Sequence, residues 1–171
     1  MLEYQITKYN PSFRDSSGAY TRDEWTSISD IGRSFGGVVL TATEYRRVED
    51  AYVAVALSFL RESGQSALTV SGLENNRKYP IEFGEGSVLA LEQLGTVIRL
   101  VLREKFWCRL EGLASFLHFG WDYYMYAGVP CSCPASQELA KKLRVFVEES
   151  PSPYKREAGA QGSGNVSVKA E

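Results

Sequence analysis

The chain begins with a period-two alternation of apolar and polar side chains. Leu2, Tyr4 and Ile6 alternate with polar neighbours, which is typical of a strand that buries one face. The pattern stops before Pro11, and the stretch 11–20 is polar and rich in turn-forming residues, so it predicts a loop.

Two segments have the Thr-x-x-Glu spacing of a capping box, at 21–24 and 41–44. In this motif the threonine oxygen accepts a hydrogen bond from a free backbone amide and the glutamate reaches back. The first segment predicts a short helix over 21–32. After the second, apolar residues at three- and four-residue steps predict a long amphipathic helix that ends before Gly64.

The remaining elements follow from the same two periodicities. We predict a strand at 68–73, a helix capped by Ser87 and running to Val101, a hairpin over 106–119, a short helix from Pro134 and a last strand at 145–147. The predicted fold class is α+β: a single domain over 1–154, with an antiparallel sheet packed by two longer helices and one or two short helices. Residues 155–171 have too little apolar content to offset the entropy of ordering them, so we predict a disordered tail.

Length and charge narrow the function classes. The 171 residues fit one domain, and their 44% hydrophobic content is enough for a full core. A formal charge of −2 and a pI near 5.6 argue against a nucleic-acid partner. No apolar run approaches the length of a membrane span and the start lacks signal-peptide features, so we expect a cytoplasmic protein without a membrane partner.

The stretch 118–126, HFGWDYYMY, is the most informative part of the chain, because six of its nine residues carry aromatic rings when the histidine is counted. Large amphipathic rings are typical anchors of protein interfaces. We predict that residues 122–126 form a third strand, or continue the previous one past a bulge at Gly120, and in a strand the side chains alternate between two faces. Burying all of them would leave hydroxyls and a carboxylate in need of partners. We therefore expect Tyr123 and Met125 to be buried and the partner-binding residues to be Trp121, Asp122, Tyr124 and Tyr126.

His118 is the only histidine, so any acid–base chemistry that needs imidazole depends on it. Asp122 could reach the ring if the chain bends at Gly120, which would give a catalytic pair. No serine or cysteine nearby has the context of a nucleophile, so the pair specifies no reaction. We favour a structural histidine with one hydrogen bond.

A zinc site is the other chemistry that the sequence raises. Cys131 and Cys133, with Cys108 and His118, could in principle complete a tetrahedral set. Structural zinc usually takes paired knuckles with two to four residues between ligands, whereas one residue separates this pair. An odd count of cysteines without a secretion signal also indicates reduced thiols. We therefore predict no metal and no cofactor.

Three blocks of the sequence resemble those of short bacterial proteins that have no settled activity. They are DEWTSISDIG at 23–32, EYRRVEDAY at 44–52 and HFGWDYYMY at 118–126. In size, acidity and lack of a catalytic set, the chain is also similar in kind to the immunity proteins that neutralise bacterial toxins. This second likeness implies a protein partner and transfers no functional residue.

These observations leave three hypotheses. The first is a cytosolic binding protein, an immunity or inhibitor protein that occludes a site on a partner protein such as a toxin. The second is a small enzyme that uses His118 and Asp122 in a cleft. The third is a homo-oligomeric structural module joined through the aromatic strand region.

Overall fold

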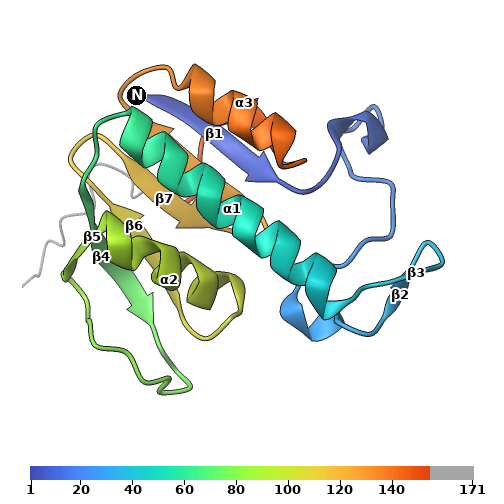
Figure 1. The fold of residues 1–171 in the computed structure, drawn as a ribbon, viewed down its shortest axis with the longest axis horizontal. Helices are drawn as coiled ribbons and strands as arrows, with labels where there is room; N and C mark the ends of the chain where they lie inside the picture. Colours follow the sequence, from blue (N-terminus) through green and yellow to red (C-terminus); the bar gives the residue numbers. More distant parts are fainter. Residues whose placement is uncertain (155–171) are drawn as a thin grey trace, which may run out of the picture.

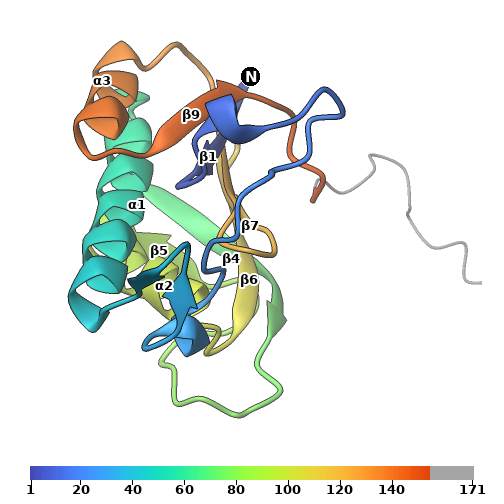
Figure 2. The same cartoon turned by 90° about the vertical axis from the view of Figure 1, so that its right-hand side faces the viewer.

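The protein has one main sheet, and its helices lie on one side of this sheet. The structure, a computed structural model, describes residues 1–154. Seven antiparallel strands form the sheet in the order β5-β4-β6-β7-β8-β1-β9. Helices α1, α2 and α3 all lie on the same face, with α1 between the other two (Figures 1 and 2). The predicted α+β class is therefore confirmed, whereas the predicted tail 155–171 lies outside the described residues.

The elements have the following bounds. The strands of the sheet are β1 (Leu2–Thr7), β4 (Ala67–Glu74), β5 (Val88–Ala90), β6 (Trp107–Glu111), β7 (Phe116–Phe119), β8 (Met125–Val129) and β9 (Phe146–Glu149). The helices are α1 (Ala42–Glu62), α2 (Leu91–Leu102) and α3 (Pro134–Lys142). A separate ribbon pairs β2 (Ser34–Phe35) with β3 (Val38–Val39), and Pro11–Phe13 and Ile28–Asp30 form single 3-10 turns.

Helix α1 is the longest element and confirms the prediction made from its sequence pattern. Thr41 caps it, because its side-chain oxygen accepts a hydrogen bond from the Glu44 amide at 3.1 Å. The predicted apolar stripe is buried, with Tyr52 and Phe59 both 0% exposed. Gly64 has a φ of 76°, the left-handed conformation that commonly follows the end of a helix.

The two faces of the sheet differ in chemistry. The face toward the helices carries core side chains, among them Leu110 and Leu117, which are cross-strand partners. The opposite face carries polar groups, including Glu111 and His118, because side chains alternate along each strand. The segment 150–154 runs over this second face and makes hydrogen bonds to it.

The predicted helix over 21–32 is wrong. The only helical turn there is Ile28–Asp30, and its N-cap is Ser27. The Thr21 hydroxyl donates to the Phe13 carbonyl oxygen at 2.7 Å, so it ties two parts of a loop together and caps no helix. A capping-box spacing marks a helix start only when the amides it would satisfy belong to a helix.

The predicted cap of the second long helix is also misplaced. Strand β5 intervenes after Ser87, and the N-cap of α2 is Ala90. The Ala90 amide donates to the side-chain oxygen of Gln93 at 3.0 Å, which satisfies one free amide without a capping hydroxyl. The Ser87 hydroxyl oxygen instead accepts a hydrogen bond from the Gly84 amide at 2.9 Å, within the preceding turn.

Candidate functional site

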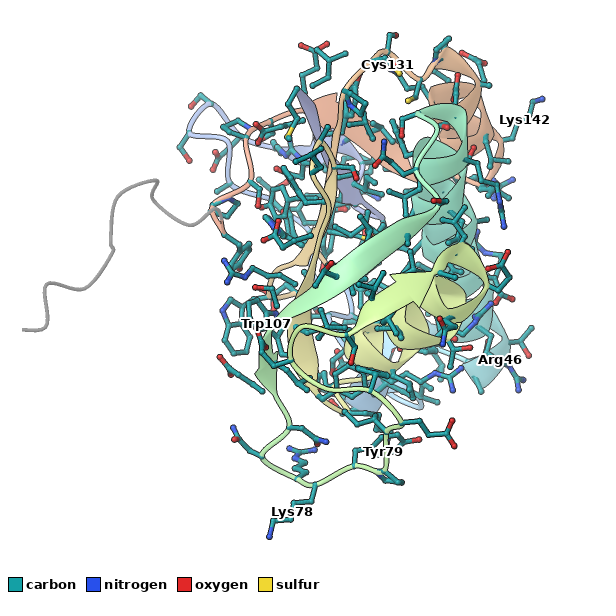
Figure 3. All side chains as sticks on the ribbon, turned by 90° about the vertical axis from the view of Figure 1, so that its left-hand side faces the viewer. Arg46, Lys78, Tyr79, Trp107, Cys131 and Lys142 are labelled. Atoms are coloured by element: carbon teal, nitrogen blue, oxygen red, sulfur yellow. The ribbon has the colours of Figure 1, made fainter. Side chains whose placement is uncertain are left out.

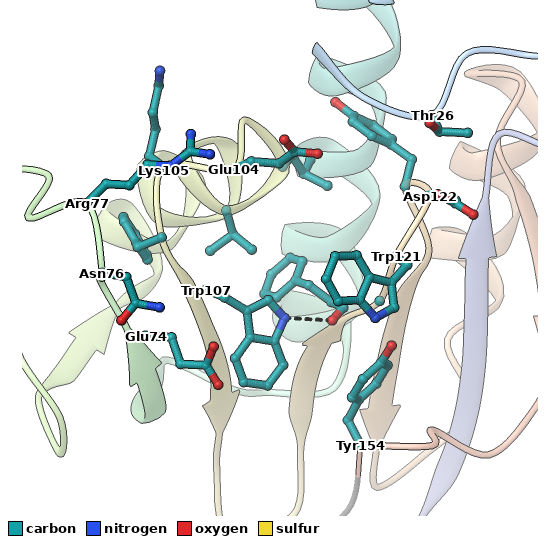
Figure 4. A pocket seen from close by; sticks show the side chains of 16 residues that line it. Thr26, Glu74, Asn76, Arg77, Glu104, Lys105, Trp107, Trp121, Asp122 and Tyr154 are labelled. Atoms are coloured by element: carbon teal, nitrogen blue, oxygen red, sulfur yellow. Dashed lines mark hydrogen bonds between the residues drawn. The ribbon is translucent and has the colours of Figure 1, made fainter. Parts of the chain in front are cut away.

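A pocket of about 560 Å³ opens at one end of the sheet (Figure 4). It lies where β4 ends, β6 begins and β7 ends, and residues around the end of α2 complete its wall. Trp107, Trp121 and Tyr154 supply aromatic side chains to this wall. The volume is within the range of roughly 300–1,000 Å³ that is common for ligand sites.

Residues 120–124 form a tight turn that places Trp121 beside the pocket. The Gly120 amide donates to the Tyr124 carbonyl at 2.8 Å, and the Tyr124 amide donates to the Trp121 carbonyl at 3.1 Å. Asp122 and Tyr123 have φ angles of 55° and 65°, a left-handed conformation that is uncommon for non-glycine residues. Because these two residues turn the chain, the strand that we predicted to begin at Asp122 begins only at Met125.

Buried tyrosine side chains hold this turn in place. The Tyr123 ring lies between Trp25 and Tyr52, at centroid distances of 5.0 and 5.1 Å. The Tyr52 hydroxyl donates to the Tyr123 carbonyl at 2.9 Å, and the Tyr9 hydroxyl donates to the Asp122 carbonyl at 2.6 Å. Burial raises the pKa of Tyr9 and of Tyr52 well above the usual range of tyrosine, so both hydroxyls remain donors.

The predicted exposure of the aromatic segment is confirmed, although the predicted strand was too long. Tyr123 is 4% exposed and Met125 is 0% exposed, whereas Trp121 is 86% exposed. Asp122 is also exposed, and it lines the pocket together with Trp121. The alternation therefore results from the turn at Asp122 and Tyr123, and not from a strand pleat.

The other two predicted contact residues lie outside the pocket. Tyr124 is half-buried, and its ring stacks on Tyr9 at a centroid distance of 5.4 Å. Tyr126 is half-buried in β8, with its ring 6.1 Å from that of Tyr154. The structure thus brings Trp121 and Asp122 together at the pocket and leaves Tyr124 and Tyr126 beside it.

Apart from Trp121 and Asp122, the sequence interpretation misses the contact residues of the pocket wall, among them Trp107, Tyr154 and Glu104. Trp107 is fixed by a hydrogen bond from its Nε1 to the Phe119 carbonyl at 2.9 Å. Tyr154 reaches the wall because its carbonyl accepts a hydrogen bond from Arg109 Nη1 at 3.1 Å. Glu104 follows α2 with a φ of 56°. The aromatic residue directly after Pro-Ser-Pro was the one sequence feature that could have pointed to Tyr154.

His118 is buried in the sheet, outside the pocket. It is 1% exposed, and its ring stacks on Phe116 with centroids 4.1 Å apart. Its Nε2 lies 3.0 Å from a Glu111 carboxylate oxygen and its Nδ1 lies 2.8 Å from the Ser152 hydroxyl oxygen. Both ring nitrogens are therefore engaged, and the predicted pair with Asp122 is not formed. The turn after β7 carries Asp122 to the surface, away from the buried ring.

Ser152, His118 and Glu111 form a hydroxyl–imidazole–carboxylate chain, which in hydrolases activates a nucleophile. Here the hydroxyl has no access to a substrate, since Ser152 is only 6% exposed. The Ser152 amide donates to a Glu3 carboxylate oxygen at 3.1 Å, so it is not available to stabilise an oxyanion. The chain of hydrogen bonds therefore anchors the segment 150–154 to the sheet.

The candidate zinc ligands do not come together. Cys108 belongs to the core between sheet and helices, whereas His118 points to the opposite face of the sheet. Cys133 is buried next to α3, whereas Cys131 is exposed at the edge of the molecule (Figure 3). Among residues 1–154, no group of three or more histidine, cysteine, aspartate and glutamate side chains could hold a metal ion. Burial raises the pKa of Cys108 to about 12 and of Cys133 to about 11, so both remain thiols.

Comparison with known proteins adds no relative to this description. The chain matches no protein-family model, no curated protein and no solved structure. The resemblance of the three sequence blocks to bacterial proteins therefore gains no support. In the described part of the chain, none of the helices has the length and apolar character that a membrane span requires.

Proposed function

We propose that this protein binds another protein through Trp121 and the pocket beside it. The observation that carries the proposal is a tryptophan that is 86% exposed on a turn fixed by buried side chains. An indole in water contributes little to the stability of the monomer, whereas tryptophan is enriched among the residues that dominate binding energy. The exposure of Trp121 therefore supports a role in a complex rather than in the core.

The backbone of the turn supports the same proposal. A residue held in an unfavourable left-handed conformation costs on the order of 1–3 kcal/mol, and such strain clusters at ligand clamps and active sites. Asp122 and Tyr123 are two such residues in succession. Hydrogen bonds from Tyr9 and Tyr52 hold both carbonyls. Because the turn is ordered before the partner arrives, less conformational entropy is lost on binding.

The proposed mode of action is occlusion of a site on the partner. An immunity or inhibitor protein in the cytoplasm would act in this way on a toxin, and the acidity and size of the chain fit that role. The described residues that line the pocket include no histidine or cysteine, so acid–base chemistry there would have to use its carboxylates. The enzyme hypothesis depended on a pair of His118 and Asp122, which the structure separates.

A matched pair of variants tests the proposal. Leu113 is fully exposed in the turn between β6 and β7, at the opposite end of these strands from the pocket. Trp121→Ala and Leu113→Ala therefore both remove an exposed apolar side chain. Proteins that the wild type retains from a lysate are identified by mass spectrometry, and the affinity of each purified partner for the three proteins is measured by calorimetry.

We expect Trp121→Ala to weaken binding of the true partner about 30-fold, which corresponds to about 2 kcal/mol. Leu113→Ala should leave the affinity unchanged. Equal affinities of the two variants would refute the proposal. Sedimentation velocity tests the homo-oligomer alternative. If the wild type self-associates and only Trp121→Ala abolishes this self-association, the partner is a second copy of the chain.

A further inference from the structure

The pocket has the features of a site for a positively charged group. Resting on the proposed function, we propose that it receives a basic side chain, arginine or lysine, which the partner protein presents. The aromatic faces of Trp107, Trp121 and Tyr154 and the carboxylate of Glu74 would hold this cation. Two properties of the pocket lead to this inference: the arrangement of its rings and the balance of its charges.

Three rings gather on one side of the pocket (Figure 4). The hydrogen bond from Trp107 Nε1 to the Phe119 carbonyl fixes the first indole. The Tyr154 ring lies 6.1 Å from it at an interplanar angle of 57°. Figure 4 shows Trp121 across from Trp107, with the hydroxyl end of Tyr154 directed toward it. The electron-rich faces of indole and phenol rings attract cations.

The charges of the wall favour the same ligand. Glu74 is the cross-strand partner of Trp107, so the two side chains are neighbours on one face of the sheet. Glu104 and Asp122 also line the pocket. Among residues 1–154, neither Glu74 nor Glu104 has an ion-pair partner, whereas the charge of Asp122 already acts on Lys8. Three carboxylates against two cations leave the wall with one net negative charge.

The two cations of the wall lie away from the rings. Arg77 and Lys105 are on the side of the pocket opposite Trp121 and Tyr154 (Figure 4). Lys105 Nζ is 6.0 Å from the centre of the Tyr79 ring, which is not part of the wall. A third cation, Arg109, donates to the Tyr154 carbonyl, but it does not line the pocket and lies 3.9 Å from a Glu111 carboxylate oxygen. The charged group of the wall beside Trp107 is Glu74, which complements a basic group (Figure 4).

The protein already holds one of its own cations in this way. Lys8 Nζ lies 4.0 Å from the ring centre of Tyr9, 4.3 Å from that of Trp25 and 3.1 Å from a Glu24 carboxylate oxygen. The Lys8 side chain is only 5% exposed. Two aromatic faces and the charges of Glu24, Asp30 and Asp122 thus surround an ammonium group that is almost out of water, although burial lowers the pKa of Lys8. The pocket offers the same groups to a cation from outside.

The first experiment titrates the full chain with capped amino acids and follows amide and indole signals by NMR. The cationic probes are N-acetyl-arginine amide and N-acetyl-lysine amide. Their neutral counterparts of similar shape are the citrulline and norleucine derivatives, and N-acetyl-glutamate amide is the anionic probe. We expect a cation to bind at least fivefold more tightly than its neutral counterpart, with shifts at the indoles of Trp107 and Trp121. The tighter of the two cations identifies the preferred side chain.

A pair of variants tests whether the cationic probes bind beside Glu74. Glu74 and Glu92 are both exposed, but only Glu74 lines the pocket, whereas Glu92 lies in the first turn of α2. Glu74→Gln should weaken binding of the cationic probes about threefold or more, and Glu92→Gln should not, although both remove one negative charge. Equal weakening by the two variants would show a long-range charge effect and overturn the proposed site.

The other outcomes of the titration also test the proposed cation site. Equal affinity for cationic and neutral probes, tighter binding of the anionic probe, or no binding of any probe would each refute the proposal. The proposed function is judged separately, by the effect of Trp121→Ala on partner affinity. A partner that depends on Trp121 while the probes show no preference for charge would leave the protein-binding role intact and remove only the basic ligand.

Discussion

The hydroxyl of Tyr52 should determine how firmly the Trp121 turn is held. Tyr52→Phe removes the 2.9 Å hydrogen bond to the Tyr123 carbonyl with almost no change of shape. Tyr52 is 0% exposed and Tyr123 is 4% exposed, so water does not replace the lost donor. A typical hydrogen bond contributes about 1 kcal/mol, and a buried acceptor left without a partner costs roughly 1–3 kcal/mol. We therefore expect the free energy of unfolding to fall by about 2 kcal/mol.

Two measurements check this value. Urea denaturation should show a midpoint lower by about 1 M, given a slope of roughly 2 kcal/mol per molar. Native-state hydrogen exchange should show faster exchange of the Gly120 and Tyr124 amides, whose hydrogen bonds close the turn. Tyr4→Phe is the control, because Tyr4 is also buried and its hydroxyl accepts a longer bond of 3.4 Å from Gln137 Nε2, which should matter less. If the two variants lose equal stability, or the Tyr124 amide keeps its exchange rate in Tyr52→Phe, the turn is not held by this bond.

Three further predictions concern other parts of the molecule. A chain that ends at Tyr154 should fold like the full chain, because residues 155–171 offer no apolar face; a melting temperature lower by more than about 4 °C would contradict this. His118→Gln should lower the free energy of unfolding by about 2 kcal/mol in denaturant, since a buried hydrogen bond, a partly buried one and a ring contact are lost, and a loss below about 0.5 kcal/mol would show that neither bond matters. Iodoacetamide should label only Cys131 in the native protein, because Cys108 and Cys133 are buried with raised pKa values, so a second adduct in the intact mass would show that a buried thiol becomes accessible.

The elements with a repeating hydrophobic pattern could be predicted from the sequence. Strand β1 and helix α1 appear where the periods of two and of 3.6 place them, because burial of one face decides their structure. The segment 21–32 shows the limit of local motifs. Its Thr21 makes a hydrogen bond to Phe13, eight residues away, and this contact replaces the helix that the motif predicts.

The site depends more strongly on contacts between distant residues. The exposure of Trp121 follows from a left-handed turn of two non-glycine residues, which no local propensity favours. That turn is held by Tyr9 and Tyr52, which lie far from it in the sequence. Tyr154 enters the pocket wall only because the segment 150–154 is anchored to the second face of the sheet. The sequence therefore identified the aromatic segment and not the pocket beside it.

The path of the segment 150–154 also decides how a binding measurement can be set up. In the pairing of β1 with β8, Ile6 lies opposite Met125 and Leu2 lies opposite Val129, so the start of the chain is at the end of these strands away from the turn of Trp121. Tyr154 lines the pocket itself. A fluorescent protein, or a linker that attaches the protein to a sensor surface, would therefore compete with the partner for space if it were joined directly after Tyr154. The same group attached before Met1 would leave Trp121 accessible.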